Sequence, residues 1–444
     1  MKYNYQLNEQ WIDDLPIFSQ IDALVVGAGA AGVAAATCLG EKNYKTLIVE
    51  NYGFVGGAAV AGLSGTICGL FNTTNNVEEK KPQQIVFGFA NRFYEALQKE
   101  GGVTGPQIYG NTWVVTHEPH AWKKVGANFL QNANVDILFH TQVVGSILDG
   151  DTFIGVVINT KSGFAKIMAS YIVDASGDAD VIYRAGLNTS KGKDGVIQNP
   201  TMIFRMGNID IDIFQKYWGY NTISPQKVID LLEKEEKLPR KKVWLFPTVR
   251  DKELLINATK IVGFDGRALD VTNPVDHSEA ELFSLEQIET FFNFMKKNIP
   301  GCENAYIVDA APEVGIRQTR TIDGIKTLKN EDVVVGTKYE DSIAKSAWPI
   351  ELHVGDKPKV KWLIDDFYEV PYGTLVPKWG ENIIVAGRCL SAQHEALASA
   401  RVTAQCFSYG QAAALAIDLS IKKEIKLREI DGKELHKELN KENT

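Results

Sequence analysis

Long apolar runs are missing from this 444-residue chain. No stretch of about 18 consecutive apolar residues occurs, so we predict no membrane-spanning helix. The first residues also lack the apolar core of a signal peptide. Long basic runs are missing too, and the formal net charge is −8, so nucleic acid is not an expected partner. The composition, with 45% apolar and 23% charged residues, is that of a globular protein of roughly two or three domains.

Cysteine pairs are also absent. The five cysteines are scattered and none stands in a C-x-x-C motif, which suggests neither a disulfide framework nor a zinc site and favours reduced thiols in the cytoplasm. His117 and His120 have no third ligand nearby in the sequence, so we expect no metal site. Only one G-x-G-x-x-G pattern follows a strand, so a second domain for NAD(P)H in the same chain is not expected.

That single glycine pattern is the most informative segment present. A short apolar run precedes Gly27, Gly29 and Gly32, and an Ala-rich helical stretch and a second apolar strand ending at Glu50 follow. Gly27 would allow a tight turn, Gly29 would let a pyrophosphate approach the backbone, and Gly32 would let the helix pack on the strand. The helix N-terminus attracts phosphate, and Glu50 is placed to accept hydrogen bonds from a ribose. The segment predicts a β-α-β unit that binds a dinucleotide.

The rest of the chain supplies further elements in a recognisable order. A glycine-rich segment follows Glu50, and its interleaved apolar residues favour a packed loop that wraps a ligand. Alternating apolar residues then predict strands over 135–140, 142–148, 153–160 and 165–167, and a buried strand over 170–175. Near the C-terminus the pattern predicts a strand over 382–386 and one long Ala-rich helix over about 399–417.

This order resembles that of the two-domain FAD flavoproteins, and particular motifs resemble the branch usually called the FAD-dependent oxidoreductase family. The similar segments are the glycine loop 56–65, VDASGDADVIYRAG at 173–186, QNPTMIFRMG at 198–207, GIRQTRTIDG at 315–324, and 370–416. The resemblance covers roughly 21–420, and the middle of the chain matches only in patches.

The resemblance implies an α/β fold, in which a Rossmann-like FAD-binding domain with a three-stranded β-meander carries an inserted α+β substrate domain. The expected divisions are an N-terminal extension (1–20), the first part of the FAD-binding domain (21–194), the insert (195–375), the second part of the FAD-binding domain (376–420) and a charged C-terminal helix or tail (421–444).

The resemblance also implies that FAD, and not NAD, occupies the glycine-rich site. Arg388 stands where many relatives have Asp, so its contact with the ribityl chain departs from the family pattern. Ala400 and Arg401 would begin the last long helix, whose positive end would face the pyrimidine edge of the flavin and stabilise negative charge there. The implied cofactor residues are Gly27, Gly29, Ala30, Ala31, Gly32, Glu50, Asn51, Gly56, Gly57, Ala58, Val143, Ala175, Gly177, Gly387, Arg388, Ala400 and Arg401.

Five residues in the same motifs are candidates for the chemistry beside the flavin. His394 and His353 could move a proton near neutral pH, or each could be a structural histidine. Arg317 and Arg320 could clamp a carboxylate, or form an ion pair that fixes the insert to the FAD-binding domain. Tyr372 could be an active-site hydroxyl or only cover the flavin.

These residues predict an enzyme that transfers a hydride between a small polar organic molecule and flavin N5. The electron partner would be O2, a quinone or another protein, and the chain could form a homo-oligomer. Three alternatives stay open at this point. The FAD could be structural or assist non-redox hydration or isomerisation, the chain could be an NAD-binding Rossmann protein without flavin, or it could be a non-enzymatic subunit of an electron-transfer complex.

Overall fold

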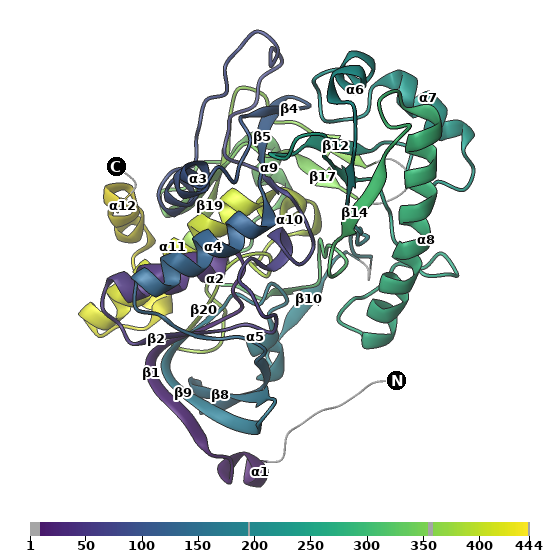
Figure 1. Cartoon of the computed structure of the whole chain (residues 1–444). Coiled ribbons are helices and arrows are strands. Elements are labelled where there is room, and N and C mark those ends of the chain that lie inside the picture. Colours follow the sequence, from purple (N-terminus) through teal and green to yellow (C-terminus); the bar gives the residue numbers. More distant parts are fainter. Residues whose placement is uncertain (1–8, 194–195, 354–357, 443–444) are drawn as a thin grey trace.

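A seven-stranded sheet forms the base of the molecule. The computed structural model describes residues 9–193, 196–353 and 358–442. The strand order is β6-β2-β1-β9-β8-β7, and β20 also pairs with β9. Figure 1 labels β1, β2, β8, β9 and β20 of this sheet. The strands span Ile17–Val26 (β1), Thr46–Val49 (β2), Asp136–Leu138 (β6), Gln142–Asp149 (β7), Thr152–Thr160 (β8), Gly163–Asp174 (β9) and Ile383–Val385 (β20).

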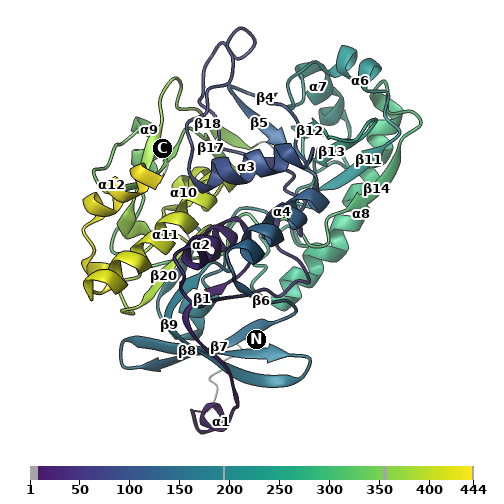
Figure 2. The same ribbon diagram turned by 60° about the vertical axis from the view of Figure 1, so that its left-hand side comes forward.

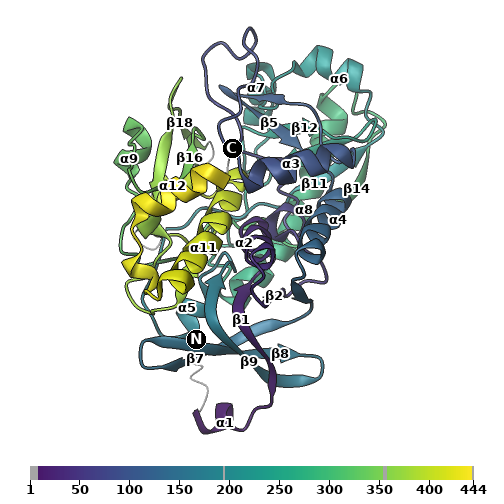
Figure 3. The same ribbon diagram turned by 90° about the vertical axis from the view of Figure 1, so that its left-hand side faces the viewer.

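The long strand β9 joins two kinds of sheet. Its first half pairs antiparallel with β8, its second half pairs parallel with β20, and β1 runs parallel to it on the other side. The strands predicted at 165–167 and 170–175 are therefore one strand. The strands β7, β8 and β9 form the expected three-stranded meander, which Figure 3 shows at the lower end of the molecule. The predicted fold class is confirmed.

Helices α2 and α11 lie together against this sheet (Figure 2). They approach closely because a Cβ on Gly410 would stand 2.1 Å from the carbonyl oxygen of Ala31. One large apolar core joins them to α3, α4 and α12. The helices of this layer span Ala30–Glu41 (α2), Phe89–Lys99 (α3), Pro119–Asn132 (α4), Thr403–Lys423 (α11) and Gly432–Glu442 (α12). Two short helices at the edge of the sheet span Glu9–Asp13 (α1) and Asp180–Arg184 (α5).

A second sheet with its own core lies beside the first, on the right in Figure 1. The strand order is β12-β13-β11-β14, and the buried aromatic residues Phe204, Trp244 and Phe291 belong to this core. The elements span Phe204–Gly207 (β11), Ile211–Trp218 (α6), Gln226–Lys234 (α7), Trp244–Pro247 (β12), Leu254–Asn257 (β13), Pro274–Asn298 (α8) and Tyr306–Ala310 (β14).

Small sheets and two short helices complete the described structure. Most buried apolar residues between Leu328 and Val376 pack with the first core, although the expected insert extends to residue 375. These elements span Thr66–Ile67 (β3), Gln107–Tyr109 (β4), Thr112–Thr116 (β5), Thr189–Lys191 (β10), Arg320–Ile322 (β15), Asn330–Val335 (α9), Ser342–Ser346 (β16), Ile350–Leu352 (β17), Lys359–Lys361 (β18), Tyr368–Pro371 (β19) and His394–Ala400 (α10). Within the described residues, no helix is long and apolar enough to cross a membrane.

The buried His117 makes folding sensitive to acid. Its ring packs on Trp122 with centroids 4.4 Å apart, and burial lowers its pKa from 6.5 to about 3. The unfolded chain thus takes up this proton below pH 6.5, whereas the folded chain does so only near pH 3. The stability contributed by neutral His117 is complete above pH 6.5 and is lost as the pH falls toward 3.

At about pH 5 this loss is expected to reach about 2 kcal/mol in the free energy of unfolding. Urea unfolding at about pH 7 and about pH 5 checks it in the wild-type protein and in His117→Leu, which has a similar volume and cannot titrate. The wild-type protein should lose about 2 kcal/mol more than the variant. Equal losses in the two proteins would show that His117 does not couple folding to pH.

Candidate functional site

A cavity of about 420 Å³ opens where the carboxyl ends of β1, β2, β9 and β20 meet the second core. This is the edge at which open α/β sheets bind their ligands. One part of the wall comes from the glycine pattern, the end of β2 and the turn after β9. The other part comes from β4, β12, β13, β17 and the start of α11. We call the part at the glycine pattern and the first sheet the outer end of the cavity, and the part beside β4, β12, β13 and β17 its inner end.

Two of the three pattern glycines are required by the fold itself. Gly27 has a φ of 95°, and a Cβ there would stand 2.6 Å from the carbonyl oxygen of Ala175. A Cβ on Gly32 would stand 1.8 Å from the carbonyl oxygen of Gly27. Gly27 thus makes the turn and Gly32 lets α2 approach the strand, so neither position needs a ligand to explain its glycine.

Gly29 differs because nothing in the fold demands a glycine there. Its φ is −71°, which any residue adopts, and a Cβ would meet only Gly57 Cα, at 3.9 Å. Gly57 lies opposite with a φ of 48°. A Cβ on Gly57 would stand 2.9 Å from Gly29 Cα, so the two glycine backbones pack closely together and present a wall without side chains to the cavity at the N-terminus of α2, where Ala30 and Ala31 also line it. This is a cradle for a pyrophosphate.

Glu50 is fixed at the end of β2 by the backbone. Its Oε2 accepts the N–H of Ala28 at 2.7 Å and its Oε1 accepts that of Tyr52 at 2.9 Å. Burial raises the pKa of Glu50, although these N–H groups oppose the rise. Each carboxylate oxygen keeps a lone pair for a ribose hydroxyl. Asn51 and Val143 line the cavity beside it.

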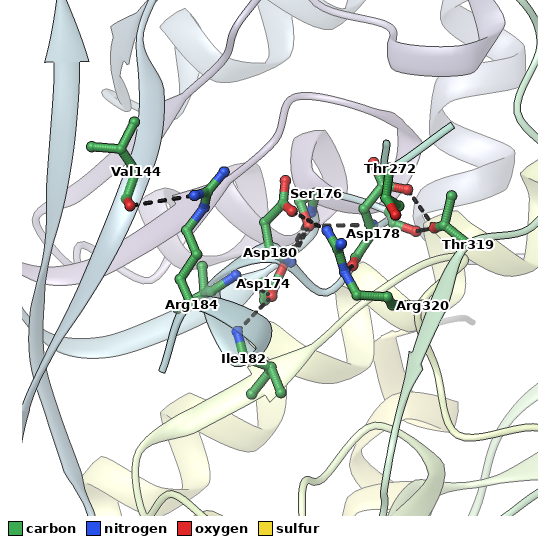
Figure 4. Close-up of polar contacts among 12 residues, drawn as sticks. Val144, Asp174, Ser176, Asp178, Asp180, Ile182, Arg184, Thr272, Thr319 and Arg320 are labelled. Carbon is green, nitrogen blue, oxygen red and sulfur yellow. Dashed lines mark hydrogen bonds and ion pairs between the residues drawn. The ribbon is translucent and has the colours of Figure 1, made fainter. Parts of the chain in front are cut away.

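The turn after β9 is held by a network of carboxylates (Figure 4). Asp174 accepts the Ser176 hydroxyl at 2.6 Å and the Val181 N–H at 2.9 Å, and burial raises the pKa of Asp174 to about 6. Arg320 binds Asp180 and donates from Nε to the carbonyl oxygen of Asp178 at 2.7 Å. Arg320 thus fixes β15 to α5, as the ion-pair interpretation of this residue predicted.

Arg388 crosses this turn and reaches the cavity wall. Its Nη2 binds Asp178 Oδ1 at 2.8 Å and lies 2.9 Å from the position of a Cβ on Gly177. Its Nη1 is buried with no hydrogen-bond partner among the described residues. An acceptor oxygen of a bound nucleotide would satisfy this N–H group, so Arg388 fits the cofactor although it replaces the Asp of the family pattern. Ala175 and Gly387 line the cavity nearby.

The predicted long helix at 399–417 is two helices. α10 ends at Ala400, and Val402, with a ψ of 163°, caps α11, which begins at Thr403. Tertiary bonds hold the break, since the N–H of Ala404 donates to the carbonyl oxygen of Cys68 at 3.1 Å. Arg401, Val402 and Thr403 line the cavity, whereas Ala400 does not. The positive helix end that faces the cavity is therefore that of α11.

The inner end of the cavity is a buried polar cluster. Tyr109 donates its hydroxyl to Glu351 Oε1 at 2.6 Å, and His353 Nε2 lies 3.7 Å from Glu351 Oε2. Arg240 Nη1 lies 3.4 Å from His353 Nδ1. Arg317 donates from Nη1 to the carbonyl oxygen of Asn199 at 2.8 Å.

Charge in this cluster is unbalanced. Burial raises the pKa of Glu351, but His353, the Tyr109 hydroxyl and Arg317 outweigh it and bring it down to about 2. Burial and the charge of Arg317 hold the pKa of His353 well below its usual range, so the imidazole is neutral. Burial also holds the pKa of Arg317 well below its usual range, and the charges of Arg240 and Arg401 add to this effect. The cluster thus contains three guanidinium groups, those of Arg240, Arg317 and Arg401, and only one carboxylate, that of Glu351.

The structure brings together only two of the five candidates for chemistry. Arg317 and His353 line the inner end of the cavity. Arg320, Tyr372 and His394 do not line it. The Tyr372 hydroxyl donates to the carbonyl oxygen of Leu427 at 2.8 Å, and His394 is the half-buried first residue of α10. Neither residue is placed to move a substrate proton in this cavity.

Sequence reasoning missed Glu351 and Tyr109. Residues two apart on a strand face the same side, so the candidate His353 should have drawn attention to Glu351 in W-P-I-E-L-H. No local signal points to Tyr109, because it reaches the site from β4, far away in the sequence. No group of three or more metal-ligating side chains occurs in the part of the chain that the structure describes.

Comparisons with known proteins found a matching family model and several similar proteins. A model of the FAD dependent oxidoreductase family matches residues 22–439. Thiamine thiazole synthase of Methanococcus maripaludis is 28% identical over 200 residues, a match that covers 43% of this chain and 66% of the relative. Digeranylgeranylglycerophospholipid reductase of Picrophilus torridus is 25% identical over 193 residues, 43% of this chain and 48% of the relative. The matches span less than two thirds of either relative.

Among solved structures, a geranylgeranyl bacteriochlorophyll reductase-like protein of Thermoplasma acidophilum is 15% identical, with a TM-score of 0.48. That alignment covers 95% of this chain and 83% of the other.

Proposed function

The chain belongs to the FAD dependent oxidoreductase family, and we propose that it transfers a hydride between a small polar organic molecule and N5 of FAD. One observation carries the proposal: a single cavity runs from the glycine cradle at Gly29 to the polar cluster at Glu351 and His353. A cofactor at the outer end and a substrate at the inner end would thus share one enclosed space. The second electron partner is O2, a quinone or another protein.

The residues of the outer end fit FAD. The part of the cavity beside Gly29 and Gly57, at the N-terminus of α2, would hold the pyrophosphate, and Glu50 would hold the adenosine ribose. The N-terminus of α11 would face the flavin and stabilise negative charge on it. Bound flavin supplies the chemistry of hydride exchange at N5 with a substrate C–H.

We assign the substrate proton to Glu351. Arg240 can only donate, so it makes His353 Nδ1 an acceptor and leaves the His353 Nε2–H directed at Glu351. His353 therefore orients Glu351 and is a positioning residue. Glu351 is ionised, lines the cavity and is held by Tyr109, so it can take the proton from an O–H or N–H group when the hydride leaves the neighbouring carbon.

The absorption spectrum of the purified protein, followed by anaerobic addition of small hydroxy acids, amino acids, alcohols and amines, tests the proposal. We expect a flavin band near about 450 nm that is released by acid precipitation and is bleached by at least one of these compounds. Product formation without bleaching would favour non-redox chemistry instead. A protein that retains FAD but is never bleached by a wide panel would contradict hydride transfer.

The proposal also covers where the protein acts and what it meets there. We propose a cytoplasmic location, and association either with further copies of the chain or with an electron-transfer partner. All five cysteines are free thiols, which supports a reducing compartment such as the cytoplasm. The resemblance to thiamine thiazole synthases covers less than half of the chain, so it supports no particular substrate.

A further inference from the structure

We propose that the inner end of the cavity binds a small organic carboxylate, with Arg317 holding the carboxylate group and an aromatic wall holding the apolar body. This inference rests on the proposed function and names the substrate class for it. Arg317 is 6% exposed as a whole residue and lines the cavity, and no ion pair between it and a carboxylate is found among the described residues. A planar guanidinium presents paired N–H groups that match a carboxylate.

Each of the three guanidinium groups of the cluster has a different place relative to the cavity. Arg401 precedes the N-terminus of α11 and is the guanidinium placed to face the flavin. Arg240 is directed at His353 and lies behind the wall. Arg317 is left for a ligand in the cavity. Its Nη1 donates to Asn199 and its Nη2 lies 3.4 Å from Asn257 Oδ1, so these contacts fix the group and leave other N–H donors unused.

Several buried N–H groups near the inner end of the cavity also have no hydrogen-bond acceptor. Arg401 Nε, Gln198 Nε2 and Trp244 Nε1 are buried with no partner among the described residues. Arg401 Nη2 binds Gln198 Oε1 at 3.3 Å, and the Trp244 ring lies 5.7 Å from that of His353, so all three donors belong to the same region. Of the three residues, only Arg401 lines the cavity. Buried donors without acceptors are costly, and an acceptor oxygen of a ligand or cofactor near Arg401 would relieve part of that cost.

An aromatic part of the cavity wall determines the shape and polarity that the rest of the ligand can have. Tyr109, Phe246 and Trp348 line the cavity, and the Tyr109 ring lies 4.9 Å from that of Trp348 and 6.2 Å from that of Phe246. Such a wall packs on a flat or apolar body. Because the same cavity must also admit the flavin, the ligand is small.

Binding of an anion at Arg317 would also make Glu351 a stronger base. His353, the Tyr109 hydroxyl and the positive charge of Arg317 together hold the pKa of Glu351 below its usual range, and a lowered pKa weakens a base. A carboxylate on Arg317 would cancel part of that charge and raise the affinity of Glu351 for a proton. The substrate would thus activate the group that accepts its proton.

Calorimetric titration of the FAD-loaded protein with acetate, succinate and benzoate, each against its amide, tests the inference. We expect at least one acid to bind about 30-fold or more tightly than its amide. Arg317→Met should abolish this preference, and Arg317→Lys should keep only part of it, because lysine retains the charge without the fork. Arg250→Met, which removes an exposed guanidinium paired with Glu118 outside the cavity, should change nothing.

Binding is scored without turnover, so its outcome is separate from that of the hydride-transfer test. Acids that bind no better than their amides, or a preference unchanged in a folded Arg317→Lys protein, would overturn the inference even if other compounds bleach the flavin. A preference for acids that depends on Arg317 would support it even in the absence of bleaching.

Discussion

A Gly29→Val protein is expected to fold normally and to lose at least about 100-fold in FAD affinity. The φ of −71° suits valine, and the only contact of the new Cβ would be Gly57 Cα at 3.9 Å, so the substitution costs the fold little. The methyl groups would instead occupy the part of the cavity beside Gly29 and Gly57, where the pyrophosphate would lie. Flavin titration followed by absorbance, with circular dichroism as the measure of folding, checks both halves of this expectation.

Gly105→Val is the matched control. Gly105 has no neighbour within 4 Å of a built Cβ and does not line the cavity, so FAD should bind this variant as it binds the wild-type protein. Gly32→Ala should behave differently from both, because its Cβ would meet the Gly27 carbonyl oxygen at 1.8 Å and damage the fold itself. If Gly29→Val bound FAD normally, the pyrophosphate would not lie at the N-terminus of α2.

Glu351→Gln is expected to slow flavin reduction by at least about 100-fold while FAD stays bound. Glutamine keeps the shape of the side chain and can still accept the Tyr109 hydroxyl, but it cannot take up a proton. The measurement is the anaerobic rate of flavin bleaching with whichever compound reduces the wild-type protein. Tyr109→Phe should slow bleaching less, because it leaves the carboxylate in place.

Glu253→Gln is the control for the removal of a buried carboxylate. Glu253 is also buried and accepts a hydrogen bond from Arg205 at 3.3 Å, but it directly precedes β13 and does not line the cavity. Its loss can lower stability, but it should leave the bleaching rate unchanged. A wild-type rate in Glu351→Gln would remove Glu351 from proton transfer and return that role to another group of the inner end.

The outer end of the cavity could be predicted from the sequence because its signals are local. The three pattern glycines and Glu50 belong to one contiguous β-α-β unit whose spacing has a direct geometric meaning. The inner end could not be predicted in the same way. Arg317 and Arg320 stand three residues apart in one motif, yet only tertiary packing decides that Arg317 faces the cavity and Arg320 pairs with Asp180.

The break between α10 and α11 illustrates the same limit. The segment from Ala398 to Ala404 contains neither Gly nor Pro, so no local signal marks the break. Bonds to β3 and its neighbours hold it, including the one from Gln405 Nε2 to the carbonyl oxygen of Gly69 at 3.0 Å. His394, close in sequence to Gly387 and Arg388, is carried away from the cavity by the start of α10.

The most direct test of the central claim, that one cavity holds FAD at its outer end and a substrate carboxylate at its inner end, is a crystal structure of the FAD-loaded protein with benzoate. The account predicts the pyrophosphate against Gly29 and Gly57 at the N-terminus of α2, and the carboxylate on Arg317 beside the flavin ring. A flavin bound elsewhere, or a benzoate held away from Arg317, would contradict it.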